Sequence, residues 1–105
     1  MRQFVAYRNR NKAAAGLYPF LLNVQSDLIR DMETRVVIPL LRAPSKRPPA
    51  PDRLSPLFEL DGEKFVLMTP MIASVGIGVL GGEAHDLSRE RATILAALDL
   101  LISGI

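Results

Sequence analysis

The sequence predicts one mainly β domain with antiparallel strands and a C-terminal α-helix. Short runs of apolar and β-branched residues alternate with turn residues over most of the chain, as in small antiparallel sheets. An Asp61-Gly62 dipeptide separates two of these runs, and residues 88–105 have a helical period. The 105 residues provide material for a single core, so residues 1–105 are expected to form one domain.

The first part of the chain is expected to contain three strands, at residues 3–8, 17–24 and 35–42. Pro19 has no amide hydrogen, so it places the second strand at a sheet edge or at a bulge. Leu28 and Ile29 form an apolar pair in the otherwise polar connection between the second and third strands.

Residues 43–56 contain five of the eight prolines of the chain. This density excludes a helix or a central strand and predicts an extended loop. The positive side chains at and within this loop are Arg42, Lys46, Arg47 and Arg53. They could bind DNA or an acidic peptide, or they could simply be solvated. The loop has no interleaved aromatic residues, which argues against stacking on nucleic-acid bases.

The Asp61-Gly62 dipeptide is the strongest hairpin signal in the sequence, with strands expected at residues 57–60 and 63–69. Two further β segments are expected at residues 71–75 and 77–80, followed by a loop at Gly81-Gly82.

The C-terminal helix is expected to begin at Ser88 as a capping residue and to end at Gly104 in a left-handed conformation. One stripe of the helix is apolar and should be buried: Ile94, Leu95, Leu98, Leu101, Ile102 and Ile105. A second face carries small and polar residues: Ala92, Ala96, Asp99 and Ser103. This second face is either solvated or contacts a partner.

Composition restricts the function classes. The net charge of +2 permits an acidic partner but does not demand nucleic acid. The chain has no cysteine and one histidine, so disulfides, thiolate metal sites and histidine-rich metal sites are excluded, and we expect no cofactor. No apolar segment is long enough for a signal peptide or a membrane span, so a cytoplasmic location is expected.

Two motifs resemble enzymatic sites in composition only. Residues 76–81 spell GxGxxG, but a dinucleotide fold needs a helix opening within the motif and a parallel strand after that helix. Glycines at bends or close backbone approaches explain this segment better. His85, Asp86 and Ser88 are the residue types of a hydrolytic triad, but neighbours along a chain do not normally converge in space.

Five blocks of the sequence, in order, resemble the CcdB family of plasmid and chromosomal toxins. The blocks are Val24-Gln-Ser-Asp27, Arg35-Val-Val-Ile-Pro-Leu40, Met68-Thr-Pro-Met-Ile-Ala-Ser-Val75, Asp86-Leu-Ser-Arg-Glu90 and Gly104-Ile105. The resemblance implies an SH3-like antiparallel β barrel with a C-terminal helix, assembled as a homodimer. It further implies a toxin that acts by binding, without catalysis.

The family's toxins poison DNA gyrase by binding its A subunit and trapping the enzyme on cleaved DNA. A cognate CcdA-like antitoxin neutralises the toxin with an acidic tail, and the pair represses its own operon. The resemblance therefore implies contact with operator DNA only through the antitoxin complex.

The resemblance places gyrase contacts on Leu28, Ile29, Asp99, Ser103, Gly104 and Ile105. The antitoxin's acidic tail is expected to meet Arg42, Lys46, Arg47 and Arg53. Well-known members carry a tryptophan where this chain has Ser103, and an asparagine where it has Asp99. The Ser103 difference leaves open an antitoxin-binding co-repressor with a decayed gyrase site. A further alternative is an RNA-cleaving toxin on the same barrel, which the single histidine and the lack of a convincing carboxylate pair disfavour.

Overall fold

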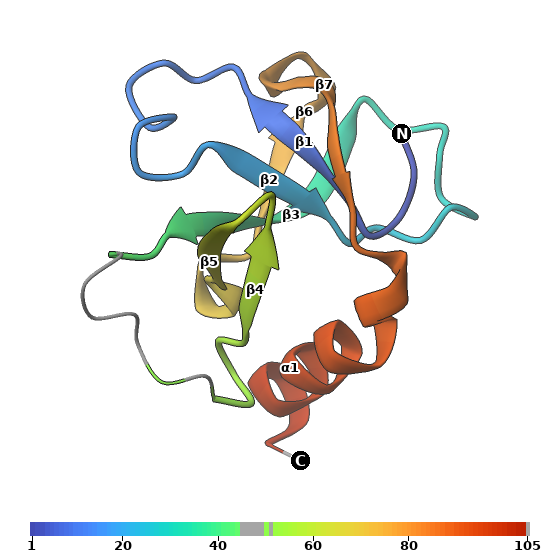
Figure 1. The fold of residues 1–105 in the computed structure, drawn as a ribbon. Helices are drawn as coiled ribbons and strands as arrows, with labels where there is room; N and C mark the ends of the chain where they lie inside the picture. The colour runs from blue at the N-terminus through green and yellow to red at the C-terminus, as the bar shows by residue number, and fades with distance from the viewer. Residues whose placement is uncertain (45–49, 51, 105) are drawn as a thin grey trace.

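The computed structural model describes residues 1–44, 50 and 52–104, which form a mainly β structure with one α-helix near the C-terminus (Figure 1). The strands are β1 (Val5–Asn9), β2 (Phe20–Asn23), β3 (Thr34–Arg42), β4 (Leu57–Leu60), β5 (Glu63–Leu67), β6 (Ala73–Gly76) and β7 (Leu80–Asp86). The helical elements are the 3₁₀ turns η1 (Thr69–Met71), η2 (Ile77–Val79) and η3 (Ser88–Glu90), and the helix α1 (Arg91–Ser103). The predicted mainly β fold with a C-terminal helix is confirmed.

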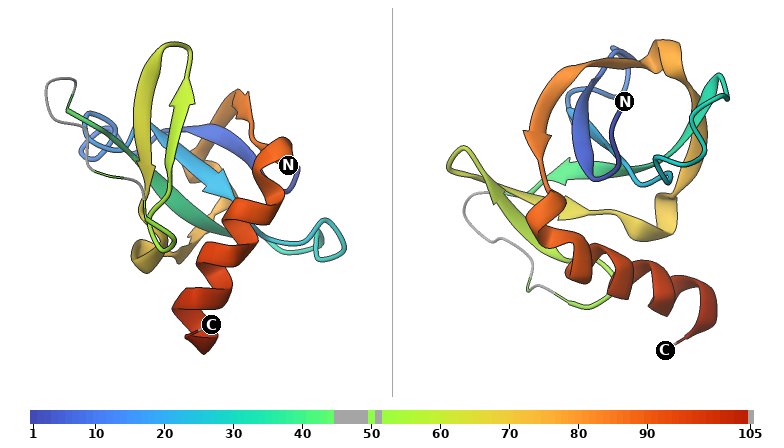
Figure 2. Two further views of the ribbon diagram at one scale, coloured as in Figure 1. Left: turned by 60° about the horizontal axis from the view of Figure 1, so that its bottom comes forward. Right: turned by 90° about the vertical axis from the view of Figure 1, so that its right-hand side faces the viewer.

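The longest strand, β3, is the centre of the sheet. One edge of β3 pairs with β2, from Phe20 opposite Leu40 to Asn23 opposite Val37. Its other edge pairs first with β6 and then with β5, and every pairing is antiparallel. The sheet order is β4-β5-β3-β2-β1-β7, and the sheet curves into a half-barrel (Figures 1 and 2).

The strands β1, β2 and β3 carry buried residues on both of their faces. Consecutive residues of a strand point to opposite sides, so these buried residues form two cores. Ala6, Leu22 and Ile38 belong to the core on one side, where Ile94 of α1 also packs. Their neighbours along the strands belong to a second core on the other side: Val5, Tyr7, Leu21 and Val37. The sheet therefore separates two small cores, and only one of them is covered by the helix.

The hairpin predicted around Asp61-Gly62 is confirmed. β4 and β5 pair from Leu57 opposite Val66 to Leu60 opposite Glu63. Asp61 and Gly62 connect them with φ values of 51° and 79°, as a type I′ turn requires at both central positions.

The helix is buried along only part of its predicted stripe. Ile94 and Ala97 are fully buried and Leu95 and Leu98 pack on the core, but the side chain of Ile102 is 80% exposed. Figure 2 shows that the C-terminal half of α1 extends away from the half-barrel. The predicted burial of Ile102 is therefore wrong, because no part of the sheet lies beneath this half of the helix. Ile105 lies outside the described residues.

The predicted helix start is also wrong, whereas its end is confirmed. Ser88 opens the turn η3 instead of capping α1, and its own backbone amide donates to the Asp86 carboxylate at 2.9 Å. Gly104 has a φ of 75°, and its amide donates to the Leu100 carbonyl at 3.0 Å. This left-handed residue ends the helix as expected.

Three sequence-based expectations for the strands are corrected. Pro19 precedes β2, which pairs on both sides and is not an edge strand. Residues 77–79 form η2, not a strand, and Gly81 and Gly82 lie within β7, not in a loop. A Cβ at Gly81 would lie 3.2 Å from the carbonyl oxygen and from the Cβ of Arg8. Gly81 therefore serves the close approach of β7 to β1, as expected for a strand glycine.

Within the described ranges, no helix combines the length and the apolar character that a membrane crossing requires.

Candidate partner-binding surfaces

The connection between β2 and β3 displays the apolar pair found in the sequence. Leu28 is 91% exposed and Ile29 is 52% exposed. Ser26 shapes the turn beneath them, because its hydroxyl accepts from the Leu28 amide at 3.1 Å and its carbonyl accepts from the Ile29 amide at 3.0 Å. Two adjacent apolar side chains are thus exposed on this loop.

This loop is fixed to the body of the protein by buried polar side chains that sequence reasoning did not single out. Gln25 and Arg35 lie beneath it and bond to its backbone. Asp27 also accepts a hydrogen bond from the Gln3 amide at 2.9 Å. An arginine in a strand of β-branched residues is expected to face solvent, so the sequence around Arg35 gives no indication that its side chain is buried beneath the loop.

The second predicted contact group lies at the end of α1. Asp99, Ser103 and Gly104 are all exposed. The Ser103 hydroxyl donates to the Asp99 carbonyl at 2.7 Å, so it is already bonded within its own helix. On the small polar face of the helix, Ala92, Asp99 and Ser103 are thus open to solvent, whereas Ala96 is half-buried.

The two groups lie apart in a single chain. The loop with Leu28 and Ile29 and the C-terminal end of α1 are separated in every view of the ribbon (Figures 1 and 2). One chain therefore does not bring them together into a single continuous site.

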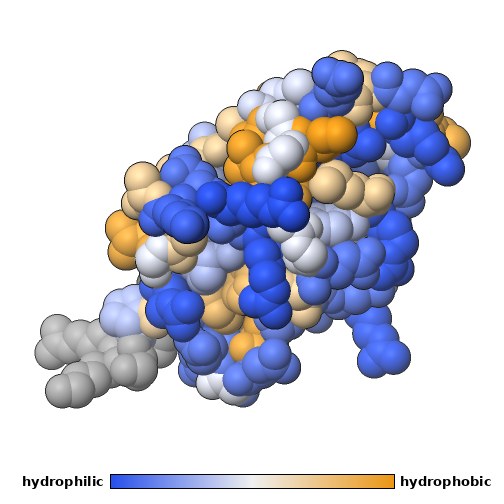
Figure 3. All heavy atoms as spheres, turned by 90° about the horizontal axis from the view of Figure 1, so that it is seen from above, coloured by the Kyte–Doolittle hydropathy of each residue, from blue (hydrophilic) through white to orange (hydrophobic). Residues whose placement is uncertain are grey.

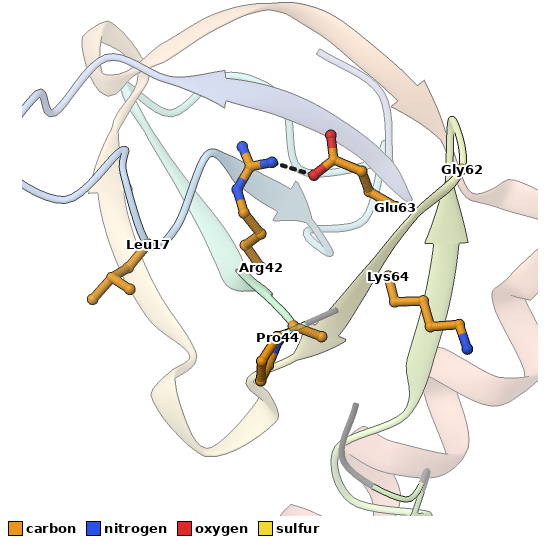
Figure 4. A pocket seen from close by; sticks show the side chains of 7 residues that line it. Leu17, Arg42, Pro44, Gly62, Glu63 and Lys64 are labelled. Carbon is orange, nitrogen blue, oxygen red and sulfur yellow. Dashed lines mark hydrogen bonds and ion pairs between the residues drawn. The ribbon is translucent and has the colours of Figure 1, made fainter. Parts of the chain in front are cut away.

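The basic residues of the proline-rich loop are only partly described. Arg42, at the end of β3, forms an ion pair with Glu63 and stacks over the ring of Phe65, 5.8 Å from its centroid. Arg42 and Lys64 line a groove of about 700 Å³ between β3, the β4–β5 hairpin and residue 17 (Figure 4). Arg53 is exposed, and Lys46 and Arg47 lie outside the described residues.

The residue types of a hydrolytic triad do not converge. The Asp86 carboxylate accepts from the backbone amide of Ser88, while the His85 ring packs edge-on against Phe20, with centroids 4.9 Å apart. The His85 Nε2 lies 4.0 Å from the carboxylate of Asp61. Residues 1–44, 50 and 52–104 contain no cluster of three acidic or histidine side chains that could hold a metal ion.

A charged cluster joins the N-terminus to β7. The Arg2 guanidinium lies 2.8 Å from Glu83 and 3.6 Å from Asp86. The hydrogen bond and the charge of Arg2 lower the pKa of Glu83. The hydrogen bonds from Ser88, and then the charges of Arg2 and Arg89, lower the pKa of Asp86. Both carboxyl groups therefore stay ionised at neutral pH and tie the N-terminus to the sheet.

Apolar side chains are also exposed elsewhere on the molecule. The face seen from above in Figure 3 is dominated by hydrophilic residues around a group of apolar ones. Exposed apolar side chains outside the two predicted contact groups include Leu17, Met71 and Ile77. Exposure alone therefore does not select the contact surfaces.

The fold and these surfaces define a small β domain with a projecting C-terminal helix and an exposed apolar loop. The sequence matches the family model described as CcdB protein over residues 3–104, nearly the whole chain. The chain therefore belongs to the CcdB family, which confirms the resemblance seen in the sequence. Membership indicates a toxin of a toxin–antitoxin system.

Proposed function

We propose that this chain is the toxin of a type II toxin–antitoxin pair that binds the A subunit of DNA gyrase and traps the enzyme on cleaved DNA. The observation that carries the proposal is membership of the CcdB family over residues 3–104, and every described position at which the resemblance places a gyrase contact is exposed. These positions are Leu28, Ile29, Asp99, Ser103 and Gly104. The chain acts by binding, because trapping an existing enzyme requires complementarity to that enzyme and no catalytic group of the toxin.

The active form is proposed to be a homodimer of SH3-like barrels. The loop group and the helix-end group lie apart in one chain, so two copies would present both groups to a single target. A chain of 105 residues also gains much from a partner subunit, since a small domain leaves about a third of its surface unburied.

The antitoxin is proposed to be CcdA-like, with an acidic tail that meets Arg42, Lys46, Arg47 and Arg53. The pair would repress its own operon in the cytoplasm, with the antitoxin supplying the contact to operator DNA. Because Arg42 already pairs with Glu63, an acidic tail must compete for it or lie along the neighbouring groove with Lys64.

Induction of the chain without antitoxin tests the poisoning activity. We expect growth arrest and gyrase-dependent DNA cleavage, and loss of both in Leu28→Asp. Leu17→Asp is the matched control, because Leu17 is also largely exposed but lies outside the proposed gyrase contacts. Normal growth at confirmed soluble expression, or equal toxicity of both variants, contradicts the proposed gyrase site.

A co-repressor without toxicity is the second candidate, and the state of Ser103 favours it. The Ser103 hydroxyl is bonded to its own helix, and a serine offers little area where the family places a tryptophan. Loss of a buried aromatic anchor costs about 2 to 4 kcal/mol at an interface. If Ser103→Trp creates toxicity in a chain that otherwise lacks it, the co-repressor function is favoured; toxicity of the natural chain excludes it.

A further inference from the structure

The loop between β2 and β3 exposes its apolar residues although its backbone has few hydrogen bonds of its own. Besides Leu28 and Ile29, Met32 is about half exposed. Backbone bonds close the base of the loop, from the Val24 amide to the Val36 carbonyl at 3.0 Å. A loop of this kind would gain free energy by folding its apolar side chains inward, so something must hold it open.

Gln25 is the first constraint. Its side chain is buried, with 9% of the residue exposed, and it bridges the loop to β3. Its Nε2 donates to the Ile29 carbonyl at 2.6 Å, and its Oε1 accepts from the Val36 amide at 3.1 Å. The side-chain amide of Gln25 thus binds the backbone amide of Val36 in β3 and the backbone carbonyl of Ile29 in the loop at the same time.

Arg35 is the second constraint. It is 8% exposed, and its Nη1 donates to the carbonyls of Met32 at 2.5 Å and Thr34 at 2.7 Å, while its Nη2 donates to the Arg30 carbonyl at 3.2 Å. Within the described part of the chain, its guanidinium forms no ion pair. A buried charge is costly unless its donors are satisfied, so these carbonyls must remain in place around it.

We propose that Gln25 and Arg35 are positioning residues that hold the loop in the conformation in which Leu28 and Ile29 face a partner. They hold the two ends of the same segment, since Gln25 bonds to the carbonyl of Ile29 and Arg35 to those of Arg30 and Met32. The pair thereby lowers the entropy that the loop would otherwise lose on binding. The functional part of this proposal rests on the proposed contact with gyrase.

Lysine cannot replace Arg35 in this role. The guanidinium presents a planar fork of donors that reaches three carbonyls, whereas an ammonium group is a compact point charge with fewer simultaneous partners at this spacing. Arg35→Lys therefore keeps the charge but releases part of the loop. Gln25→Met keeps the approximate volume of the side chain and removes both of its hydrogen bonds.

Amide hydrogen exchange on the full-length free protein tests the positioning directly. We expect the Leu28 and Ile29 amides, which donate to Ser26 within the loop, to exchange about ten-fold faster in both variants, with β1 and the N-terminal half of α1 unchanged. Arg8→Lys is the matched control, because Arg8 is exposed on β1. If Arg35→Lys fails to fold, Gln25→Met decides the result. Unchanged loop exchange in a folded variant overturns the proposal.

Affinity for the purified gyrase A subunit tests whether the loop conformation matters for binding. If the binding-competent loop is populated about a tenth of the time, the apparent Kd rises about ten-fold. Arg35→Lys should add little in a chain that already carries Leu28→Ala and Ile29→Ala, because residues that act through the same contact are not additive. If Arg35→Lys weakens the affinity for gyrase by the same factor in the natural chain and in the chain with Leu28→Ala and Ile29→Ala, the positioning role is wrong.

The two proposals fail in different ways. If the natural chain does not bind gyrase, the proposed function is wrong, while the exchange measurement still decides whether Gln25 and Arg35 hold the loop. If the natural chain binds and the variants bind equally well despite faster loop exchange, the positioning role is wrong and the proposed function stands.

Discussion

Gly81 shows how a single missing side chain allows two strands to approach. A Cβ there would lie 3.2 Å from the carbonyl oxygen of Arg8, whereas a Cβ at the neighbouring Gly82 would contact nothing within 4 Å. We expect Gly81→Ala to lower the free energy of unfolding by about 1 to 3 kcal/mol, because backbone must shift to admit the methyl group. Chemical denaturation of both variants measures this, with Gly82→Ala as the control. Equal stabilities would mean that β7 moves freely over β1.

Asp86 makes the stability of the molecule depend on pH in a defined direction. Its pKa is lowered in the folded state by the hydrogen bonds from Ser88 and the charges of Arg2 and Arg89. A carboxyl group with a lowered folded-state pKa stabilises the protein above its ordinary pKa of about 3.9, and this contribution is lost as the pH falls through the folded-state value.

Asp86→Asn should therefore melt at a lower temperature than the natural chain at pH 7, and the difference should shrink as the pH falls below about 3.9 toward the lowered folded-state pKa of Asp86. Melting curves of both proteins across this pH range measure the effect. Asp31→Asn is a control at another exposed carboxyl group. A difference that persists unchanged in acid would mean that Asp86 acts through the shape of its side chain and not through its charge.

The exposure of the predicted contact residues could be inferred from the sequence. The buried side chains that bond to the loop backbone beneath them could not. Leu28 and Ile29 stand out because apolar residues are rare in a polar connection, and they are exposed as their surroundings suggest. Gln25 and Arg35 have no such contrast with their neighbours. Gln25 and Arg35 bond to the loop backbone only because the loop between β2 and β3 folds back over them. The alternation of residues along a strand does not predict the path of that loop.

The helix α1 divides into a buried half and a free half, and two isoleucines measure the division. Ile94 is fully buried, whereas Ile102 is mostly exposed. Ile94→Ala should lower the free energy of unfolding by about 2 to 5 kcal/mol, because it leaves a cavity against the sheet. Ile102→Ala should change it by about 0.5 kcal/mol or less. Comparable losses in denaturation would mean that the free half of the helix is packed in solution.

At the level of elements, local signals sufficed where the chain itself imposes the geometry. The Asp61-Gly62 turn and the end of α1 at Gly104 depend on positive φ angles that few residues adopt, so the sequence indicates them directly. The strand β7 was missed because Gly81 and Gly82 are typical of a loop, and the need for a glycine beside Arg8 depends on tertiary contact. The buried extent of α1 depends likewise on where the sheet ends.

The whole molecule presents its contact groups at separate places, and this arrangement is informative about assembly. The chain belongs to the CcdB family over residues 3–104, and its β2–β3 loop and the C-terminal end of α1 are exposed. Both findings agree with the proposal that the protein acts by binding a partner. The separation of the loop group and the helix-end group in one chain is the reason that we propose a homodimer.

The proposed homodimer should have a stability that depends on protein concentration, because a dimer that unfolds into two chains is stabilised by mass action. A tenfold rise in concentration adds about 1.4 kcal/mol to the stability of a dimer. The entropy of unfolding of two chains of this length is about 0.4 kcal/mol per kelvin. The melting temperature should therefore rise by about 3 °C for each tenfold increase in protein concentration. Sedimentation at the same concentrations should give twice the mass of one chain. A melting temperature independent of concentration, together with the mass of a single chain, would leave the loop and helix groups as two separate sites and contradict the homodimer.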